Sequence, residues 1–321
     1  MVRGPFNPPR GTAPSLSDKH LEFYDGGHKM KITASMVKDL RTKTGAGMMD
    51  CKKALVEAEG DMDKAVDILR EKGLSQAAKK ASRVAAEGAV VSAISEDGKT
   101  GTIVEVNCET DFVGSNEDFR ALAHSIAQQI IAVNPADVEA LLASDLNGKT
   151  VKDTVTEAVA KIGENISVRR FVRYESAEGK VYSYIHGGGK IGVLVEVKGG
   201  DDELGKDIAM QVAAANPSYL NRTEVPQAEI EHEKEVLAVE ARNEGKPEKI
   251  IEKMVLGRIN KYYKEVCLVD QEFIKDGDLT IAKLLKSKNA DVLRFARFQL
   301  GEGIERKQDD LAAEVAKQLN Q

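Results

Sequence analysis

The chain has 321 residues, 31% of them charged and 42% hydrophobic, and a formal net charge of −6. These values are typical of a globular protein with a helical bias and, at roughly 100–200 residues per domain, of two or three domains. The acidic balance argues against direct nucleic-acid binding, and no apolar run approaches the roughly 20 residues of a membrane span.

Residues 1–29 hold four of the eight prolines and show no apolar periodicity. They lack the apolar core of a secretory signal, and Asp18, Glu22 and Asp25 argue against a transit peptide. We interpret this segment as an added or dispensable, disordered leader, and we expect the natural chain to start at Met30.

Residues 30–73 predict three short helices, because capping residues and glycines alternate with apolar positions at helical spacing. Met48 and Met49 follow the break at Gly45-Ala46-Gly47. Two adjacent large apolar residues cannot both face so small a core, so at least one should meet a partner. The alternative is that both fill gaps between the helices. The expected segments are Thr33 or Ser35 to Thr44, Asp50 to Gly60, Asp61 to Gly73, and a linker over 74–87 whose Lys79-Lys80 pair forms a solvated helical face.

From residue 88 the pattern changes to the period of two that is typical of strands, with amphipathic helices between them. This alternation predicts an α+β core with antiparallel strands, the first two joined by a hairpin turn at Glu96-Asp97-Gly98. The expected strands are Ala89–Ser95, Thr102–Asn107, Ile166–Tyr174, Val181–Ile185, Ile191–Val197, Glu265–Leu268 and Val292–Leu300. The expected helices include Phe119–Ile131, one ending at Ile162, one ending before Pro217, and Thr280–Lys286.

The core contains an internal repeat. Gly101–Val106 recurs as Gly192–Val197, and the helix after each copy ends in Asn-Pro, at Pro135 and Pro217. From glycine to proline the first copy spans 34 positions and the second 25, so the first has nine extra residues between strand and helix.

The extra segment contains Thr110-Asp111-Phe112-Val113. Loops held on a rigid scaffold often carry function, and an aromatic residue next to an acid in such a loop is typical of a partner-binding element. The alternative is that Phe112 folds back on its own core while Asp111 orders the turn.

Three further segments lie around the repeat. The first is the segment His186-Gly187-Gly188-Gly189-Lys190, which has the composition of a phosphate-binding loop. Its place between two strands favours a hairpin turn instead. A contact between His186 and a partner beside this turn is left as an alternative. Pro226 to Val266 predicts two antiparallel helices with a thin apolar stripe, which pack on a second subunit or a partner. The chain ends in a helix whose stripe of Leu311, Val315 and Leu319 docks on its own body or on a neighbour.

The sequence shows no catalytic or metal-binding constellation. It has no nucleotide phosphate loop, nucleophile elbow or dinucleotide fingerprint. Cys51, Cys108 and Cys267 are far apart and odd in number, which is typical of reduced cytosolic thiols. We therefore expect a cytoplasmic binding protein with no catalytic residues, no metal and no cofactor.

Four segments occur in a characteristic order: 44–55 (TGAGMMDCKKAL), 110–113 (TDFV), His186-Gly187 before 191–195 (IGVLV), and 301–305 (GEGIE). Together they closely resemble the family of bacterial translation elongation factor Ts. The similarity extends from Met30 to the C-terminus and leaves out only the leader.

The resemblance implies a guanine-nucleotide exchange factor that binds elongation factor Tu in its GDP-bound and nucleotide-free states. It implies no chemistry of its own and no direct contact with nucleic acid or membrane, and it leaves open a homodimer or a 2:2 complex. The implied division is a ubiquitin-associated-like helical domain at 30–73, a linker at 74–87, core subdomains at 88–170 and 171–303 with a helical hairpin inserted at about 222–264, and a C-terminal helical module at 304–321.

The resemblance also implies partner-binding residues. Asp111 and Phe112, within the segment from Thr110 to Val113, would reach the GTPase domain of elongation factor Tu near switch II, with Phe112 as the exchange wedge. The other implied contacts are Arg41, Met48 and Met49 on another face of that domain, His186 and Gly187 on the other domains, and Leu311 and Val315 of the C-terminal helix.

Two other functions compete with nucleotide exchange, and a third explains only the first helices. A chaperone or assembly subunit would bind elongation factor Tu without speeding nucleotide release. An enzyme with an unusual active site would need a pocket lined by titratable groups, for which the sequence offers no candidate cluster. A ubiquitin-like-binding adaptor would account for residues 33–73 but not for the repeated core.

Overall fold

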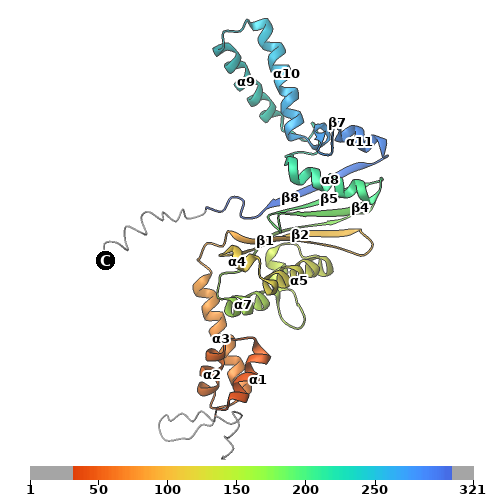
Figure 1. Ribbon diagram of the computed structural model, residues 1–321. Helices are drawn as coiled ribbons and strands as arrows, with labels where there is room; N and C mark the ends of the chain where they lie inside the picture. The colour runs from red at the N-terminus through yellow and green to blue at the C-terminus, as the bar shows by residue number, and fades with distance from the viewer. Residues whose placement is uncertain (1–31, 306–321) are drawn as a thin grey trace, which may run out of the picture. The chain divides into compact units, whose positions relative to one another are not determined.

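A computed structural model describes residues 32–305 (Figure 1). The predicted leader over 1–29 and the predicted C-terminal helix with Leu311 and Val315 lie outside the described residues. The chain divides into two compact units, with the boundary between Gln76 and Ala77. No helix in the described part is long and apolar enough to cross a membrane.

The first unit is built from three helices, as predicted, and the third of them continues past the boundary at Gln76. They are α1 (Ala34–Thr44), α2 (Met48–Glu57) and α3 (Met62–Lys80). Thr33 accepts a hydrogen bond from Met36 N at the start of α1, and Gly45 ends that helix in the left-handed conformation, with φ at 69°. A small apolar core then forms between the helices, with Leu40, Cys51 and Leu55 fully buried.

Two predicted boundaries in this unit are wrong. Gly47, rather than Asp50, precedes α2, so Asp50 lies in the first turn of the helix. Gly73 does not end α3, which continues to Lys80 and places Lys79 and Lys80 in its last turn. A glycine inside a helix costs only about 1 kcal/mol, and the Ala- and Lys-rich residues after Gly73 are good helix formers. The first half of the predicted linker is therefore helical.

The second unit is built on two antiparallel sheets of three strands each. The first has the order β1-β2-β3 and the second the order β4-β5-β8. Helix α5 packs on β1 and β2, and α8 packs on β4 and β5 (Figure 1), so the repeat seen in the sequence is a repeat of sheet and helix. The elements are β1 (Glu87–Ile94), β2 (Thr100–Cys108), β3 (Ser167–Glu175), β4 (Lys180–His186), β5 (Ile191–Lys198), β8 (Asp291–Gln299), α5 (Glu117–Val133) and α8 (Asp202–Ala215).

The two glycines that mark the repeat allow the sheets to approach one another. A Cβ atom at Gly192 would lie 2.3 Å from Val90 Cγ1, and one at Gly101 would lie 2.6 Å from Val181 Cγ1. Each glycine therefore receives a valine from the first strand of the other repeat. The shared core between the sheets contains Val90, Ile103, Tyr174, Val181, Leu194 and Phe298.

The remaining elements connect and extend the repeats. The helical hairpin is confirmed as α9 and α10, but the predicted strand at Glu265–Leu268 is wrong, because α10 continues to Val266 and a short 3-10 helix follows. The pair β6-β7 was not predicted, since a two-residue strand such as β6 is too short to show alternation. These elements are α6 (Val138–Ala143), α7 (Val151–Ile162), α9 (Gln227–Asn243), α10 (Glu248–Val266), η1 (Leu268–Asp270), β6 (Glu272–Phe273), β7 (Asp276–Thr280) and α11 (Ile281–Ser287).

A buried carboxylate joins the middle of β2 to the end of β8. Glu105 is fully buried and accepts hydrogen bonds from Arg170 Nε at 2.7 Å, Gly301 N at 2.8 Å and Arg169 Nη1 at 3.0 Å. Burial by itself raises the pKa of Glu105, but the bonds from Gly301, Arg170, Asn107 and Arg169 outweigh it and lower the pKa below the usual 4.5. The carboxylate therefore remains charged inside the protein.

Replacing Glu105 by glutamine should reduce stability in a pH-dependent way. A depressed pKa in the folded state contributes stability that is present above about pH 4.5 and is lost as the pH falls through the folded-state pKa. The difference in unfolding free energy between parent and E105Q should therefore shrink as the pH is lowered below about 4.5. Urea unfolding at a series of pH values measures this difference. A difference that stays constant with pH would contradict this role of the charge.

Candidate functional site

The connection between β2 and α5 in the first repeat contains a single helical turn, α4 (Asp111–Gly114). The prediction that all nine extra residues lie between strand and helix is wrong in part, because this connection covers residues 109–116 and its counterpart covers 199–201, and the other extra residues lengthen β2 and α5. Thr110 caps this turn by accepting a hydrogen bond from Val113 N at 3.4 Å. Phe112 is 85% exposed, the highest value among the large apolar side chains of the described residues. The alternative that Phe112 folds back on its own core is therefore wrong.

The turn is held by a residue that the sequence analysis missed. Glu164, just after α7, accepts hydrogen bonds from Glu109 N at 3.1 Å, Thr110 N at 3.0 Å and Thr110 Oγ1 at 2.7 Å. The exposed Asp111 carboxylate has no hydrogen-bond or ion-pair partner among residues 32–305. Glu164, rather than Asp111, therefore orders the loop. The only signal in the sequence was an acidic residue between the helix-ending Gly163 and the next strand.

Replacing Glu164 by alanine should loosen the base of α4 without unfolding the protein. Bonds to a charged acceptor contribute about 1.5–3 kcal/mol each, so the amides of Glu109 and Thr110 should exchange with solvent at least about tenfold faster. Hydrogen exchange resolved by residue measures this. Glu157→Ala, which removes an exposed ion pair of α7 with Lys149, is the matched control. Equal protection in both variants would show that other contacts hold the loop.

The Gly-rich segment after His186 is a hairpin turn between β4 and β5, as predicted. Gly187, Gly188 and Gly189 all have positive φ, at 58°, 64° and 99°, and Val90 N donates to Gly189 O at 2.8 Å. His186 is exposed, and its Nδ1 lies 3.1 Å from the hydroxyl of Tyr184. An exposed imidazole beside a glycine turn remains available to a partner.

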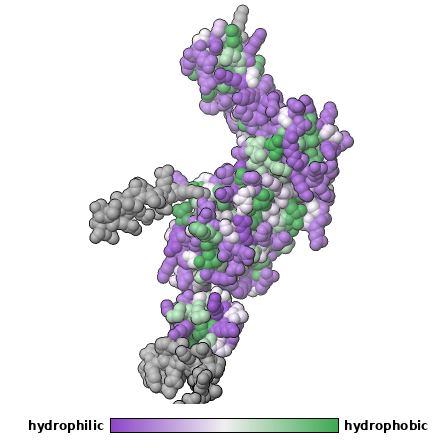
Figure 2. All heavy atoms as spheres, viewed as in Figure 1, coloured by the Kyte–Doolittle hydropathy of each residue, from purple (hydrophilic) through white to green (hydrophobic). Residues whose placement is uncertain are grey.

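In the first unit, the residues predicted to bind a partner are also exposed. Met48 is 59% exposed and Met49 is 60% exposed, both in the first turn of α2. The alternative that both fill gaps between the helices is therefore wrong. Arg41 lies exposed in the last turn of α1. On the face shown in Figure 2 most residues are hydrophilic. Two adjacent exposed methionines are unusual on a surface of that kind.

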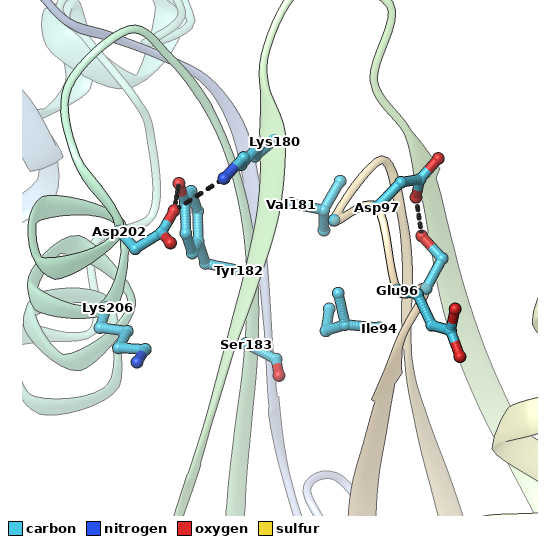
Figure 3. Close-up of a pocket in the computed structure, with 11 residues that line it drawn as sticks. Ile94, Glu96, Asp97, Lys180, Val181, Tyr182, Ser183, Asp202 and Lys206 are labelled. Atoms are coloured by element: carbon cyan, nitrogen blue, oxygen red, sulfur yellow. Dashed lines mark hydrogen bonds and ion pairs between the residues drawn. The ribbon is translucent and has the colours of Figure 1, made fainter.

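A pocket of about 320 Å³ lies between the β1–β2 turn and β4. In Figure 3 the side chains of Lys180 and Tyr182 both point at Asp202, with contacts of 3.0 and 2.9 Å. Burial and the bond to Asp202 raise the pKa of Tyr182 to about 12, and the bond from Lys180 lowers that of Asp202. These three groups therefore satisfy one another.

The described residues contain no cluster of three or more His, Cys, Asp or Glu side chains placed to hold a metal. Cys51, Cys108 and Cys267 are each buried and free. Burial and the nearby Glu164 raise the pKa of Cys108 to about 12, and its thiol donates to Thr110 O at 3.1 Å. This thiol is therefore protonated and supports the base of α4.

Comparison with known proteins shows the family. A sequence model described as Elongation factor TS matches residues 109–302. Elongation factor Ts of Clostridium perfringens is 56% identical over 298 residues, covering 89% of this chain and 98% of that protein. The chain belongs to the elongation factor Ts family. The elongation factor Ts of Clostridium acetobutylicum is 55% identical over 303 residues, covering 90% of this chain and 99% of its own.

Membership in the elongation factor Ts family confirms the resemblance found in the sequence and places the chain among the translation elongation factors. The matched segment begins at Glu109, so it contains the whole α4 turn, its anchor Glu164 and the His186 turn. It ends at Glu302, next to the Gly301 amide that donates to Glu105.

Proposed function

We propose that this chain is a guanine-nucleotide exchange factor for elongation factor Tu, acting in protein synthesis without catalytic chemistry of its own. The observation that carries the proposal is Phe112, which is 85% exposed at the tip of a turn held by Glu164. An apolar side chain that is already ordered and exposed can fill a pocket of a partner at little conformational cost.

The mechanism follows from differential affinity. A GTPase holds GDP through its phosphate loop and a Mg²⁺ ion between phosphate and protein. An exchange factor accelerates release only if it binds the nucleotide-free state better than the GDP-bound state. In the proposed complex, Phe112 enters the GTPase domain near switch II with Asp111 beside it. This insertion displaces the elements that order the Mg²⁺ and phosphate site, after which GTP binds.

The other proposed contacts follow the resemblance. Their support is exposure: Arg41, Met48, Met49 and His186 all lie at the surface, as a contact role requires. The proposed assignments are Arg41, Met48 and Met49 to another face of the GTPase domain, His186 and Gly187 to the other domains, and Leu311 and Val315 to a docking helix.

The proposed organisation is a ubiquitin-associated-like domain at 30–73 and two core subdomains at 88–170 and 171–303, with the hairpin inserted at about 222–264. The proposed C-terminal module, 304–321, follows directly after the second subdomain. The proposed location is the cytoplasm, and elongation factor Tu is the proposed partner, with a homodimer or a 2:2 complex as the proposed assembly. Nucleic acid and membrane are not proposed as partners.

The release of fluorescent GDP from elongation factor Tu tests the proposal. Adding the parent protein should accelerate release at least about tenfold, within the range of typical coupling free energies, and saturably with its concentration. Binding of elongation factor Tu with an unchanged release rate would support a chaperone or assembly subunit instead. An absence of binding would overturn both functions.

A further inference from the structure

One arginine contacts both loops that the proposed function assigns to the partner. Arg120 lies near the start of α5, where its backbone N donates to Asn116 O at 3.0 Å. Its Nε donates to Gly114 O at 2.7 Å, and its Nη2 donates to Gly188 O at 2.6 Å. The first acceptor is the last residue of α4 and the second lies in the turn after His186.

Each of these loops needs an external partner. The carbonyl of Gly114 is at the end of a one-turn helix, where no following turn can supply a donor. The turn at 187–189 consists of three glycines, which have no side chains to restrict their backbone. Apart from Arg120, the bond from Val90 N to Gly189 O ties this turn to β1. Arg120 therefore bridges a short helix and a turn that cannot order themselves.

Each loop also has backbone hydrogen bonds of its own. Gly114 N donates to Thr110 O at 3.1 Å, and Gly189 N and Lys190 N donate to His186 O at 3.2 and 3.0 Å. Arg120 connects these two segments through its side chain. A Cβ atom at Gly189 would lie 3.4 Å from Arg120 Nη1 and 3.0 Å from Ala89 Cβ, so the guanidinium packs closely against the turn.

We propose that Arg120 is a positioning residue that joins the Phe112 turn and the His186 turn into one preorganised partner-binding surface. The proposal rests on the exchange function for its effect on activity, but not for its structural content. The planar guanidinium presents Nε–H and Nη2–H along one edge, which suits two carbonyl acceptors at once. A lysine has a single ammonium group and cannot reproduce this fork.

Hydrogen exchange of the free protein tests the structural content directly. In Arg120→Ala and Arg120→Lys, the amides of Gly189 and Lys190 should exchange at least about tenfold faster than in the parent, while those in the middle of β2 stay unchanged. The control is Lys161→Ala. It removes a cation of α7 that pairs at 2.7 Å with Asp118 on α5, the helix that carries Arg120. This variant should leave the turn protected. Unchanged protection of Gly189 and Lys190 in both Arg120 variants would overturn the proposal.

The kinetics of GDP release test the functional content. Because Glu164 still holds the Phe112 turn, Arg120→Ala should raise the concentration of factor needed for half-maximal release about five- to tenfold. The maximal rate should fall less than about twofold. If Arg120 acted on stability alone, Arg120→Ala would lower the midpoint of thermal unfolding. It would leave the ratio of the half-maximal factor concentration to the maximal release rate unchanged.

A double-mutant cycle separates positioning from a contact of Arg120 itself. His186→Ala should weaken binding of elongation factor Tu in the parent, and should weaken it by a smaller factor in the Arg120→Ala background, because the turn is already displaced there. Equal factors in both backgrounds would overturn the coupling. If the parent protein failed to accelerate GDP release from elongation factor Tu, the proposed nucleotide-exchange function would be wrong. The hydrogen-exchange experiment would still decide the role of Arg120.

Discussion

Phe112→Ala is expected to lower the factor-stimulated rate of GDP release at subsaturating factor by at least about 30-fold. Truncating a central aromatic anchor typically costs 2 kcal/mol or more of interaction free energy, and 1.4 kcal/mol is a factor of ten. The free protein should keep its stability, because Phe112 is 85% exposed and contributes little to the core. The measurement is the release of fluorescent GDP as a function of factor concentration, with thermal unfolding alongside.

Two further variants make the Phe112 result specific. Phe112→Leu keeps an apolar side chain in the same place and should lose less than Phe112→Ala. Ile274→Ala removes another exposed apolar side chain, 44% exposed on the loop between β6 and β7, and should leave the rate unchanged. If Phe112→Ala retained the parent's rate, the exposed aromatic would not be the wedge, and the proposed mechanism would have to be abandoned.

Gly88→Ala is expected to give the largest loss of stability among single methyl additions near the site. Gly88 has φ at 127°, and an added Cβ atom would lie 2.2 Å from Val106 O and 2.8 Å from Asn107 Cα. Both are backbone atoms of the paired strand and cannot rotate away. Strain at such a backbone conformation and overpacking each cost about 1–3 kcal/mol, so the loss should reach about 3 kcal/mol or more.

The same substitution should also reduce exchange activity, because Gly88 lies against the end of α4. A Cβ atom at Gly114 would be only 2.8 Å from Gly88 O, so a shift of β1 moves the base of the Phe112 turn. Thermal unfolding should show a midpoint lower by about 6 °C or more, at roughly 2–4 °C per kcal/mol for a protein of this size.

Gly148→Ala is the matched control for Gly88→Ala. Gly148 also has positive φ, at 83°, but an added Cβ atom would meet nothing within 4 Å. This variant should therefore show the cost of backbone strain alone, about 1 kcal/mol, with full exchange activity. Equal losses of stability in the two glycine variants would show that the close approach of β1 to β2 is not a constraint.

The two repeats use one scaffold for different purposes. In the second repeat, Gly199 and Gly200 join β5 to α8 directly, both with positive φ, at 74° and 70°. In the first repeat the same position carries α4 with Phe112 at its tip. A tight glycine turn leaves no side chain to present, whereas the longer connection at 109–116 places an aromatic side chain outside the core while Glu164 keeps its base in place.

The sequence by itself determined most of the elements of the two repeats, and it determined their repetition. Helix caps such as Thr33, the short apolar runs of β1 and β2, and the two matching Gly-to-Asn-Pro segments are local signals, because each depends on residues a few positions apart. The same signals failed where a residue is compatible with two local structures. Gly73 can end a helix, but it can also lie inside one, and α3 continues through it.

Only the tertiary structure decided which side chains are paired and which are exposed. Glu164 lies 54 positions from Thr110 and Gly301 lies 196 positions from Glu105, yet each pair is hydrogen-bonded. Periodicity carries no information about such distant partners, because pairing depends on how whole elements pack. The exposure of Phe112 and Met49 has the same origin. Sequence marked both as candidates, and within residues 32–305 no element covers either side chain, so both are exposed.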